Sequence, residues 1–311
     1  MLLHWLKAFR LRTLPLSFST IIMGNALALF VGYFDIEIFV FTLLTTLFLQ
    51  ILSNLANDYG DGVKGTDNAN RLGPTRALQS GNITVKQIKI GIVVCTALAL
   101  ISGLYLVLYA VQFENNLQLI FIALGVGAIL AAIKYTVGKS AYGYHGLGDA
   151  FVFIFFGLVG VGGSFFLQTQ FTSLLILLPA ISMGCLSSAV LNLNNMRDIE
   201  NDAAMQKNTL VVMLGLKKAK IYHYSLFIVT YLSLIAFILL IDNQQSSLQI
   251  ALSIGTGLII IPHLKHIQTV AKARDYHSFD PELKKIALST ALLSLIWLVA
   301  IIYFNKSVSV L

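Results

Sequence analysis

Charged residues are scarce in this sequence. Lys, Arg, Asp and Glu make up 11% of its 311 residues, whereas hydrophobic residues make up 57%. Because a soluble domain usually carries about a quarter charged residues, this composition disfavours a water-soluble fold and predicts a chain that lies in lipid. Cysteine is equally scarce. Cys95 and Cys185 both lie inside apolar runs, which excludes a disulfide framework and predicts two small core residues.

Histidine offers no metal site either. The six histidines have no spacing that places three metal ligands on one face, and with no Cys and His set a zinc site is excluded. We therefore leave all six without a role. They are His4, His145, His223, His263, His266 and His277.

What the sequence has in abundance is long apolar runs. About 20 apolar residues cross a hydrocarbon core of roughly 30 Å as a helix. Nine runs meet this length: Leu14–Tyr33, Ile38–Leu55, Ile88–Ala110, Leu117–Val137, Gly148–Gln168, Phe171–Leu191, Ile221–Ile241, Ser247–Ile261 and Ile286–Phe304. The predicted fold class is all-α, a polytopic membrane protein with nine transmembrane helices in a bundle. Eight later runs favour an uncleaved first helix over a signal peptide.

Basic residues are concentrated in every second link between these runs, counting the N-terminal segment as the first. The basic segments carry Lys7, Arg10 and Arg12; Lys64, Arg71, Arg76 and Lys86; Lys134 and Lys139; Arg197, Lys207, Lys217, Lys218 and Lys220; and Lys265, Lys272, Arg274, Lys284 and Lys285. The intervening links hold Asp35, Glu37, Glu114 and Asp242, and Lys306 lies in the C-terminal tail. Because Lys and Arg mark the cytoplasmic side, the N-terminus is predicted to be cytoplasmic. The net charge of +7 is spread over these links, which disfavours nucleic acid as a partner.

Two clusters of carboxylates and amides lie on this predicted cytoplasmic side. One follows the second run and the other follows the sixth, about 140 residues later. If helical, each places three residues on one face: Asn54, Asn57 and Asp61 in the first, and Asn194, Asp198 and Asp202 in the second. Each cluster follows the second span of a group of four, the first group being spans one to four and the second group spans five to eight. This predicts a parallel repeat of residues 14–137 and 148–261, with an extra helix at 286–304, in one domain over residues 1–311.

These clusters predict a cation site. Carboxylates at a helix C-terminus are electrostatically unfavourable, and Mg²⁺ prefers oxygen ligands that bridge it to substrate phosphates. The alternative is a solvated acidic loop, which two equivalent clusters on one membrane side disfavour. The candidate metal ligands are Asn57, Asp58, Asp61, Asn194, Asp198 and Asp202. Asp67 follows two glycines, so its helical phase is undefined and a role in lining the loop stays open.

Basic and aromatic residues near the clusters extend the prediction. Arg71, Arg76, Arg197 and Lys207 are suited to clamp a diphosphate, although the cytoplasmic bias for basic residues explains them equally well. Bound Mg²⁺ and diphosphate indicate ionisation of an allylic diphosphate, which leaves an allylic cation. Aromatic faces stabilise such a cation. Tyr135 is the favoured candidate, whereas an interfacial aromatic belt is favoured for Tyr142 and Tyr144, and a helix-start role for Asp149.

The spacing Asn57-Asp58-x-x-Asp61 with Asp198-x-x-x-Asp202 resembles the paired Asp-rich motifs of the UbiA superfamily of intramembrane prenyltransferases. Further similar stretches lie between residues 10 and 215. The resemblance implies nine transmembrane helices around a central cavity open to the cytoplasmic side of a bacterial inner membrane. It implies Mg²⁺-dependent transfer of a polyprenyl group from its diphosphate to an aromatic acceptor. One branch of the superfamily prenylates 1,4-dihydroxy-2-naphthoate with loss of CO₂, giving demethylmenaquinone for menaquinone biosynthesis. Its sequence motif resembles the stretch Tyr144-x-Gly146-Leu147-Gly148-Asp149 of this chain.

The resemblance also implies roles for individual residues. Asn57, Asp61, Asp198 and Asp202 would be the main Mg²⁺ ligands, with Asp58 and Asn194 beside them. Tyr135, Lys134 and Arg76 would be catalytic, and Arg10, Arg71, Arg197 and Lys207 would bind the diphosphate or the acceptor. The sequence departs from the family pattern in having Arg10-Leu11 for Arg-Pro and Gln206-Lys207-Asn208-Thr209 for Gly-Lys-x-Thr.

Two other functions stay open at this point. One is a prenyltransferase of the same superfamily with another acceptor, such as 4-hydroxybenzoate. The other is a cation-coupled transporter, although transporter sites usually lie near the bilayer midplane and these carboxylates are predicted at the cytoplasmic rim. The expected partners are a polyprenyl diphosphate, an aromatic acceptor and membrane lipid, with no nucleic acid. The sequence does not specify prenyl length or oligomeric state.

Overall fold

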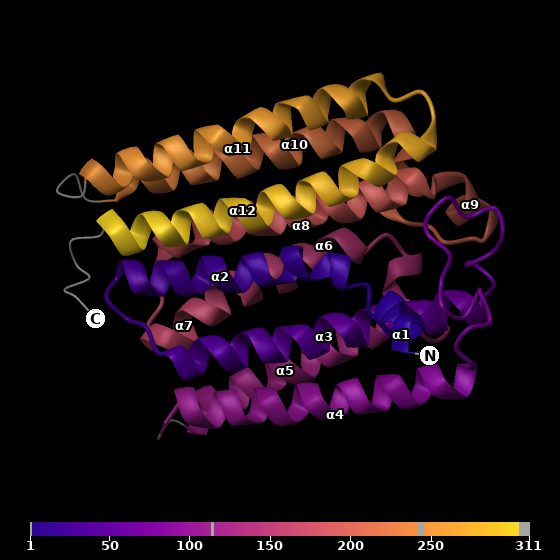
Figure 1. Ribbon diagram of the computed structural model, residues 1–311, viewed down its shortest axis with the longest axis horizontal. Coiled ribbons are helices and arrows are strands. Elements are labelled where there is room, and N and C mark those ends of the chain that lie inside the picture. Colours follow the sequence, from indigo (N-terminus) through magenta and orange to yellow (C-terminus); the bar gives the residue numbers. More distant parts are fainter. Residues whose placement is uncertain (1, 113–114, 242–245, 305–311) are drawn as a thin grey trace.

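The computed structural model describes residues 2–112, 115–241 and 246–304. Within these residues nine helical segments are long and apolar enough to cross a membrane, as the sequence predicts. The helices run side by side in one bundle (Figure 1), and α1 and α9 lie at the same end of it. Glu114, Asp242 and Lys306, whose charges entered the orientation argument, lie outside the described residues.

The helical elements have the following bounds. They are α1 Leu2–Phe9, α2 Leu14–Phe30, α3 Ile36–Val63, α4 Val85–Ala110, α5 Asn115–Lys134, α6 Gly148–Val152, the π-helix η3 Phe153–Gly163, α7 Ser164–Thr169, α8 Leu177–Arg197, α9 Ile199–Ala204, α10 Leu210–Leu240, α11 Ser246–Lys272 and α12 Asp280–Phe304. Short 3₁₀ turns form at η1 Leu11–Thr13, η2 Tyr142–Tyr144, η4 Leu174–Ile176 and η6 Tyr276–Phe279. Among the described residues the fold contains no β-strand, and one isolated bridge joins His145 to Asn208.

Several helices extend beyond the apolar runs at the end that carries the acidic clusters. There α3 ends at Val63, α10 begins at Leu210, α11 ends at Lys272 and α12 begins at Asp280. The links are therefore shorter than the apolar runs alone predict, because α3 continues through the first acidic cluster and α10 includes the Lys217 region. Hydropathy detects only the part of a helix that lies in lipid, whereas the backbone hydrogen bonds of a helix continue through polar residues.

Glycines bring the central helices into close contact. A Cβ on Gly24 of α2 would lie 2.4 Å from the carbonyl oxygen of Val161 in η3, and one on Gly157 of η3 would lie 2.6 Å from that of Ala180 in α8. Both distances are too short for any side chain. Because helices in lipid associate through close packing of small residues, these glycines allow α2, η3 and α8 to form the centre of the bundle.

Buried histidines join the last three long helices. His223 Nε2 of α10 lies 2.8 Å from His266 Nε2 of α11, and His266 Nδ1 lies 2.7 Å from a Glu282 oxygen of α12. His263 Nε2 lies 2.7 Å from the Ser289 hydroxyl. These contacts fix the relative positions of α10, α11 and α12. The sequence left the histidines without a role because their partners lie on other helices.

Candidate active site

The first acidic cluster occupies the last turns of α3. This helix continues through Asp61 to Val63, which confirms that Asn57 and Asp61 lie in helical register. Gly60 lies between them, where a Cβ would meet Thr136 Oγ1 at 2.4 Å. The chain that follows α5 can therefore pack directly on the cluster, and the Thr136 hydroxyl donates to Asn57 Oδ1 at 3.3 Å.

The second cluster lies where α8 ends and α9 begins. Asp198 is the residue between the two helices. Its N–H donates to the Asn194 carbonyl at 3.2 Å, and the Asp202 N–H donates to the Asp198 carbonyl at 2.8 Å. The backbone thus keeps the four-residue spacing through the junction, so the predicted register of Asn194, Asp198 and Asp202 is confirmed.

Lys207 connects the two clusters. Its Nζ lies 3.1 Å from Asp61 Oδ2 and 3.9 Å from Asp202 Oδ1. Asp61 is 4% exposed, Asp202 3% and Lys207 7%. Burial lowers the pKa of the Lys207 ammonium, but Asp61 and Asp202 together raise it above its ordinary value. Carboxylates from the two sequence clusters therefore face one site at one end of the bundle.

Arg71, in the link between α3 and α4, makes a second bridge. Its Nε lies 3.3 Å from Asp67 Oδ1, and its Nη2 lies 3.3 Å from Asp198 Oδ2. Asp198 also accepts hydrogen bonds from Arg197 at 3.0 and 2.7 Å. Burial raises the pKa of Asp198, but Arg197 and Arg71 bring it below its ordinary value. Asp198 is thus ionised and surrounded by cations.

Two other carboxylates of the site, those of Asp67 and Asp202, have cationic neighbours but accept no hydrogen bond from them. Neither oxygen of Asp67 accepts a hydrogen bond from any described residue, and burial, followed by the charge of Asp61, raises its pKa to about 7. Burial also raises the pKa of Asp202 to about 7, against the opposing effect of Lys207. Two buried carboxyls of the site therefore accept no hydrogen bond from a cationic side chain, and their oxygens fit a further cation.

The donor set favours a hard divalent cation. Its side chains offer carboxylate and amide oxygens, the ligands that Mg²⁺ prefers. In the part of the chain that the structure describes, no three His, Cys, Asp or Glu side chains group closely enough to hold a metal by themselves. A metal ion here would complete its coordination with water or with the oxygens of a phosphate substrate, as Mg²⁺ commonly does.

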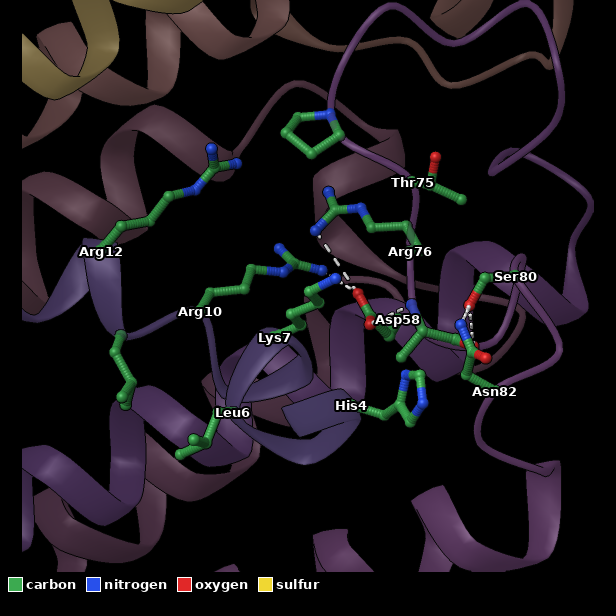
Figure 2. A pocket seen from close by; sticks show the side chains of 13 residues that line it. His4, Leu6, Lys7, Arg10, Arg12, Asp58, Thr75, Arg76, Ser80 and Asn82 are labelled. Carbon is green, nitrogen blue, oxygen red and sulfur yellow. Dashed lines mark hydrogen bonds and ion pairs between the residues drawn. The ribbon is translucent and has the colours of Figure 1, made fainter. Parts of the chain in front are cut away.

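Asp58 faces a different side of α3. Its Oδ1 contacts the guanidinium of Arg10 and lies 3.4 Å from Arg76 Nη1, and its Oδ2 accepts from the Ala77 N–H at 3.3 Å. Figure 2 shows the ends of both arginines directed at this carboxylate. The structure therefore places Asp58, which the sequence grouped with the metal ligands, where it holds Arg10 and Arg76 rather than facing Lys207.

Arg197 is also engaged within the protein. It is 1% exposed, and besides Asp198 it donates to Asn194 Oδ1 at 2.8 Å and forms an ion pair with Asp280. These contacts occupy its guanidinium and the Asn194 oxygen. The sequence grouped Arg197 with the substrate-binding residues and Asn194 with the metal ligands, whereas in the structure they bind each other and brace the second cluster.

Tyr135 lines an apolar cavity. The cavity has a volume of about 680 Å³ and extends from Asn57 and Tyr135 among α2, α3, α4, α5 and η3. Glycines form a slot for the Tyr135 ring. A Cβ on Gly143 would lie 2.8 Å from Tyr135 Cε2, and one on Gly148 would lie 3.0 Å from the same atom. An aromatic ring is thus held between the acidic clusters and a space suited to a hydrocarbon chain.

The belt interpretation of Tyr142 and Tyr144 is wrong. The Tyr144 hydroxyl donates to Asp61 Oδ1 at 2.8 Å, so Tyr144 is part of the site. Tyr142 lines the apolar cavity, and its ring stacks on Phe151 with centroids 4.0 Å apart. Hydropathy does not distinguish a tyrosine that faces headgroups from one that faces a polar site. Lys134 is exposed at the end of α5, and the structure does not bring it to the clusters.

Fold and site together define a membrane-embedded protein with paired acidic clusters, the first of which borders an apolar cavity. The sequence model of the UbiA prenyltransferase family matches residues 17–288. The chain therefore belongs to the UbiA prenyltransferase family, which confirms the resemblance seen in its motifs.

Characterised relatives agree with this assignment. A 1,4-dihydroxy-2-naphthoate octaprenyltransferase of Haemophilus influenzae is 48% identical over 236 residues, which are 75% of this chain and 76% of the relative. The protein of the same name from Escherichia coli is 48% identical over 220 residues, covering 70% and 71% of the two chains. A solved UbiA homologue from Archaeoglobus fulgidus, bound to GPP and Mg²⁺, shares the fold with a TM-score of 0.66 at 16% identity, covering 97% of this chain and all of that one.

Proposed function

We propose that this chain transfers a polyprenyl group from its diphosphate to 1,4-dihydroxy-2-naphthoate, with loss of CO₂, to give demethylmenaquinone in menaquinone biosynthesis. Two relatives with 48% identity carry the corresponding name. The observation that carries the proposal is the bridge from Asp61 through Lys207 to Asp202, because it joins both acidic clusters in one site, while Asn57 of the first cluster lines the apolar cavity.

Mg²⁺ is the cofactor that we propose for this site. The raised pKa values of the buried Asp67 and Asp202 carboxyls support it, and the solved Archaeoglobus homologue is bound to this ion. Asn57, Asp61, Asp198 and Asp202 would hold the metal. When bound, Mg²⁺ would supply positive charge to a departing diphosphate.

The cationic side chains of the site favour departure of the diphosphate. The bond between the allylic carbon and the diphosphate oxygen breaks, and its electron pair leaves with the oxygen. Lys207, Arg71 and Arg76 carry positive charge at this rim, and such groups bind a leaving phosphate more strongly as its charge grows. They stabilise the transition state of ionisation rather than the bound substrate alone.

Tyr135 stabilises the allylic cation that remains, and the apolar cavity protects it from water. The face of an aromatic ring attracts a cation, and burial raises the pKa of the Tyr135 hydroxyl, which keeps the ring neutral. Apolar walls exclude water that would otherwise capture the cation. The acceptor ring then forms the new carbon–carbon bond, and the electron pair of its bond to the carboxylate returns to the ring as CO₂ leaves.

We further propose that the site faces the cytoplasm in a bacterial inner membrane. Lys7, Arg10 and Arg76 lie at the same end of the bundle as the acidic clusters, and basic residues mark the cytoplasmic side. Ser80 is an exposed residue of the α3–α4 link. A Ser80→Cys variant should react with a membrane-impermeant maleimide only after the cells are opened, and labelling in intact cells would contradict this orientation.

An acceptor assay tests the proposed reaction. Membranes that contain the protein are incubated with Mg²⁺, a defined polyprenyl diphosphate and either 1,4-dihydroxy-2-naphthoate or 4-hydroxybenzoate, and the products are analysed by mass spectrometry. We expect a prenylated naphthoquinol that has lost the mass of CO₂, from the first acceptor only. A product from 4-hydroxybenzoate alone would refute the assignment of the acceptor while leaving prenyl transfer intact.

A further inference from the structure

A second cavity lies beside the acidic site. It has a volume of about 600 Å³ and lies between α1, the turn that follows it and the α3–α4 link. Its lining includes four basic side chains, those of Lys7, Arg10, Arg12 and Arg76, and one carboxylate, that of Asp58. Figure 2 shows the ends of Lys7, Arg10 and Arg76 pointing toward Asp58. The proposed prenyl transfer leaves Lys7 and Arg12 without a role.

The positive charge of this pocket exceeds its negative charge. Asp58 is already shared by Arg10 and Arg76, and neither Lys7 nor Arg12 forms an ion pair with a described carboxylate. Burial, and then the nearby charge of Arg197, lowers the pKa of Arg76 to about 10. Cations gathered this closely repel one another unless an anion lies between them, so the pocket suits a ligand with more than one negative charge.

Arg76 borders both this pocket and the acidic site. Its Nη1 lies 3.4 Å from Asp58, and its Nε lies 3.5 Å from Asp67 Oδ1. That Nε is buried and donates no hydrogen bond to any described residue. An anion that leaves the acidic site next to Asp67 would therefore pass a guanidinium that already lines the basic pocket.

The surroundings of the pocket indicate the class of ligand. Guanidinium groups bind phosphate oxygens in pairs, and a lysine ammonium adds a point charge. Neutral hydrogen-bonding side chains, Thr75, Ser80 and Asn82, complete the lining. The pocket also opens beside exposed leucines, Leu6 at 39% and Leu11 at 42% exposure, so a phosphate group can reach it either free from solution or at the head of a lipid.

We propose that this pocket is a second phosphate-binding site, which binds a phosphate group without a metal ion and receives the diphosphate released by the acidic site. The second half of this statement rests on the proposed function, whereas the first half does not. Binding without metal follows from the charges: the pocket is lined by four basic side chains and one carboxylate, whereas the basic side chains of the acidic site are already paired with its carboxylates.

Binding of inorganic diphosphate to the purified full-length protein tests the site. The protein is placed in phosphatidylcholine nanodiscs with EDTA, and binding is measured by calorimetry. We expect one equivalent to bind, and about tenfold or greater weakening in a Lys7→Gln/Arg12→Gln double variant, because the loss of even one contact to a charged group reduces affinity by about this factor. A Lys217→Gln/Lys218→Gln variant, changed at two exposed lysines of α10, should bind as the wild type does.

Two results would overturn the proposal: no binding to the wild type in EDTA, or equal affinity in the wild type and the Lys7→Gln/Arg12→Gln variant. Nanodiscs that also contain phosphatidylglycerol then identify the source of the phosphate. Competition by this lipid in the wild type supports a lipid headgroup at the same site, and unchanged affinity supports free diphosphate. Because EDTA prevents metal-dependent transfer, this outcome is separate from the acceptor assay, whose failure would affect the proposed function and the receipt of released diphosphate but not the binding of phosphate in this pocket.

Discussion

Replacing Lys207 with alanine removes the ammonium that bridges the two acidic clusters. Lys207 is 7% exposed, and its partners Asp61 and Asp202 are 4% and 3% exposed. Removing one partner of a buried ion pair costs about 3–5 kcal/mol because the remaining charge stays buried without compensation. We therefore expect the metal-free Lys207→Ala protein to lose about this much unfolding free energy and to melt several degrees below the wild type.

The response to Mg²⁺ distinguishes this explanation from a general packing defect. In the variant the metal would replace the missing positive charge between Asp61 and Asp202, so Mg²⁺ should raise its melting temperature more than that of the wild type. Thermal unfolding in detergent, followed by intrinsic fluorescence with EDTA and then with Mg²⁺, measures both quantities. Lys217→Ala, at an exposed position of α10, is the matched control. Equal melting temperatures of Lys207→Ala and the wild type in EDTA would refute this explanation. An equal Mg²⁺-induced rise in melting temperature in these two proteins would refute it as well.

Three further outcomes are expected. Asp61→Asn and Asp198→Asn should each lower turnover by at least about a hundredfold while the protein still inserts into membranes, and normal turnover in both would contradict the metal assignment. Gly148→Ala should lower kcat by roughly 10 to 100-fold, because its Cβ would lie 3.0 Å from the Tyr135 ring; Gly257→Ala, where a Cβ meets nothing within 4 Å, should leave kcat unchanged. Burial raises the pKa of the Asp67 and Asp202 carboxyls from the ordinary 3.8 to about 7 in the folded protein. Between about pH 4 and 7 the folded protein therefore binds more protons than the unfolded one. The stability of the metal-free protein should therefore fall as pH rises through this window, and Mg²⁺ affinity, measured by titration, should weaken below about pH 7 because a protonated carboxyl is a poor ligand.

The number of spans and the place of the acidic site could be predicted from the sequence. Each span is an apolar run of sufficient length, and hydropathy detects it without any knowledge of packing. The acidic clusters were conspicuous because the chain around them is almost free of charge. Their predicted helical spacing is present in α3 up to Asp61 and across the junction of α8 and α9 up to Asp202. It could be predicted because local backbone hydrogen bonds determine it.

The contacts between segments could not be predicted. Tyr144 bonds Asp61 across 83 residues, and Arg71 connects Asp67 to Asp198 on another helix. Such pairs depend on how the helices pack, which no periodicity in a single sequence records. The parallel repeat of residues 14–137 and 148–261, with residues 286–304 as an extra helix, stays a prediction.

The same limit explains the residues whose neighbours differ from expectation. Asp58 lies within the first motif, yet a helix turns each side chain by about 100°, and this one faces Arg10 and Arg76. The burial of Arg197 could not be predicted either, because its position in a basic segment does not reveal which side chains surround it. Motif membership predicted the neighbourhood of these side chains correctly but not their partners.

In the proposed site both acidic clusters bind one metal ion together with the diphosphate. Electron spin resonance on protein loaded with Mn²⁺ in place of Mg²⁺, and with an unreactive thiolo-analogue of a prenyl diphosphate, tests it directly. We predict ³¹P coupling to the protein-bound Mn²⁺ in the wild type, and its loss in both Asp61→Asn and Asp198→Asn. Unchanged coupling in either variant would contradict the claim.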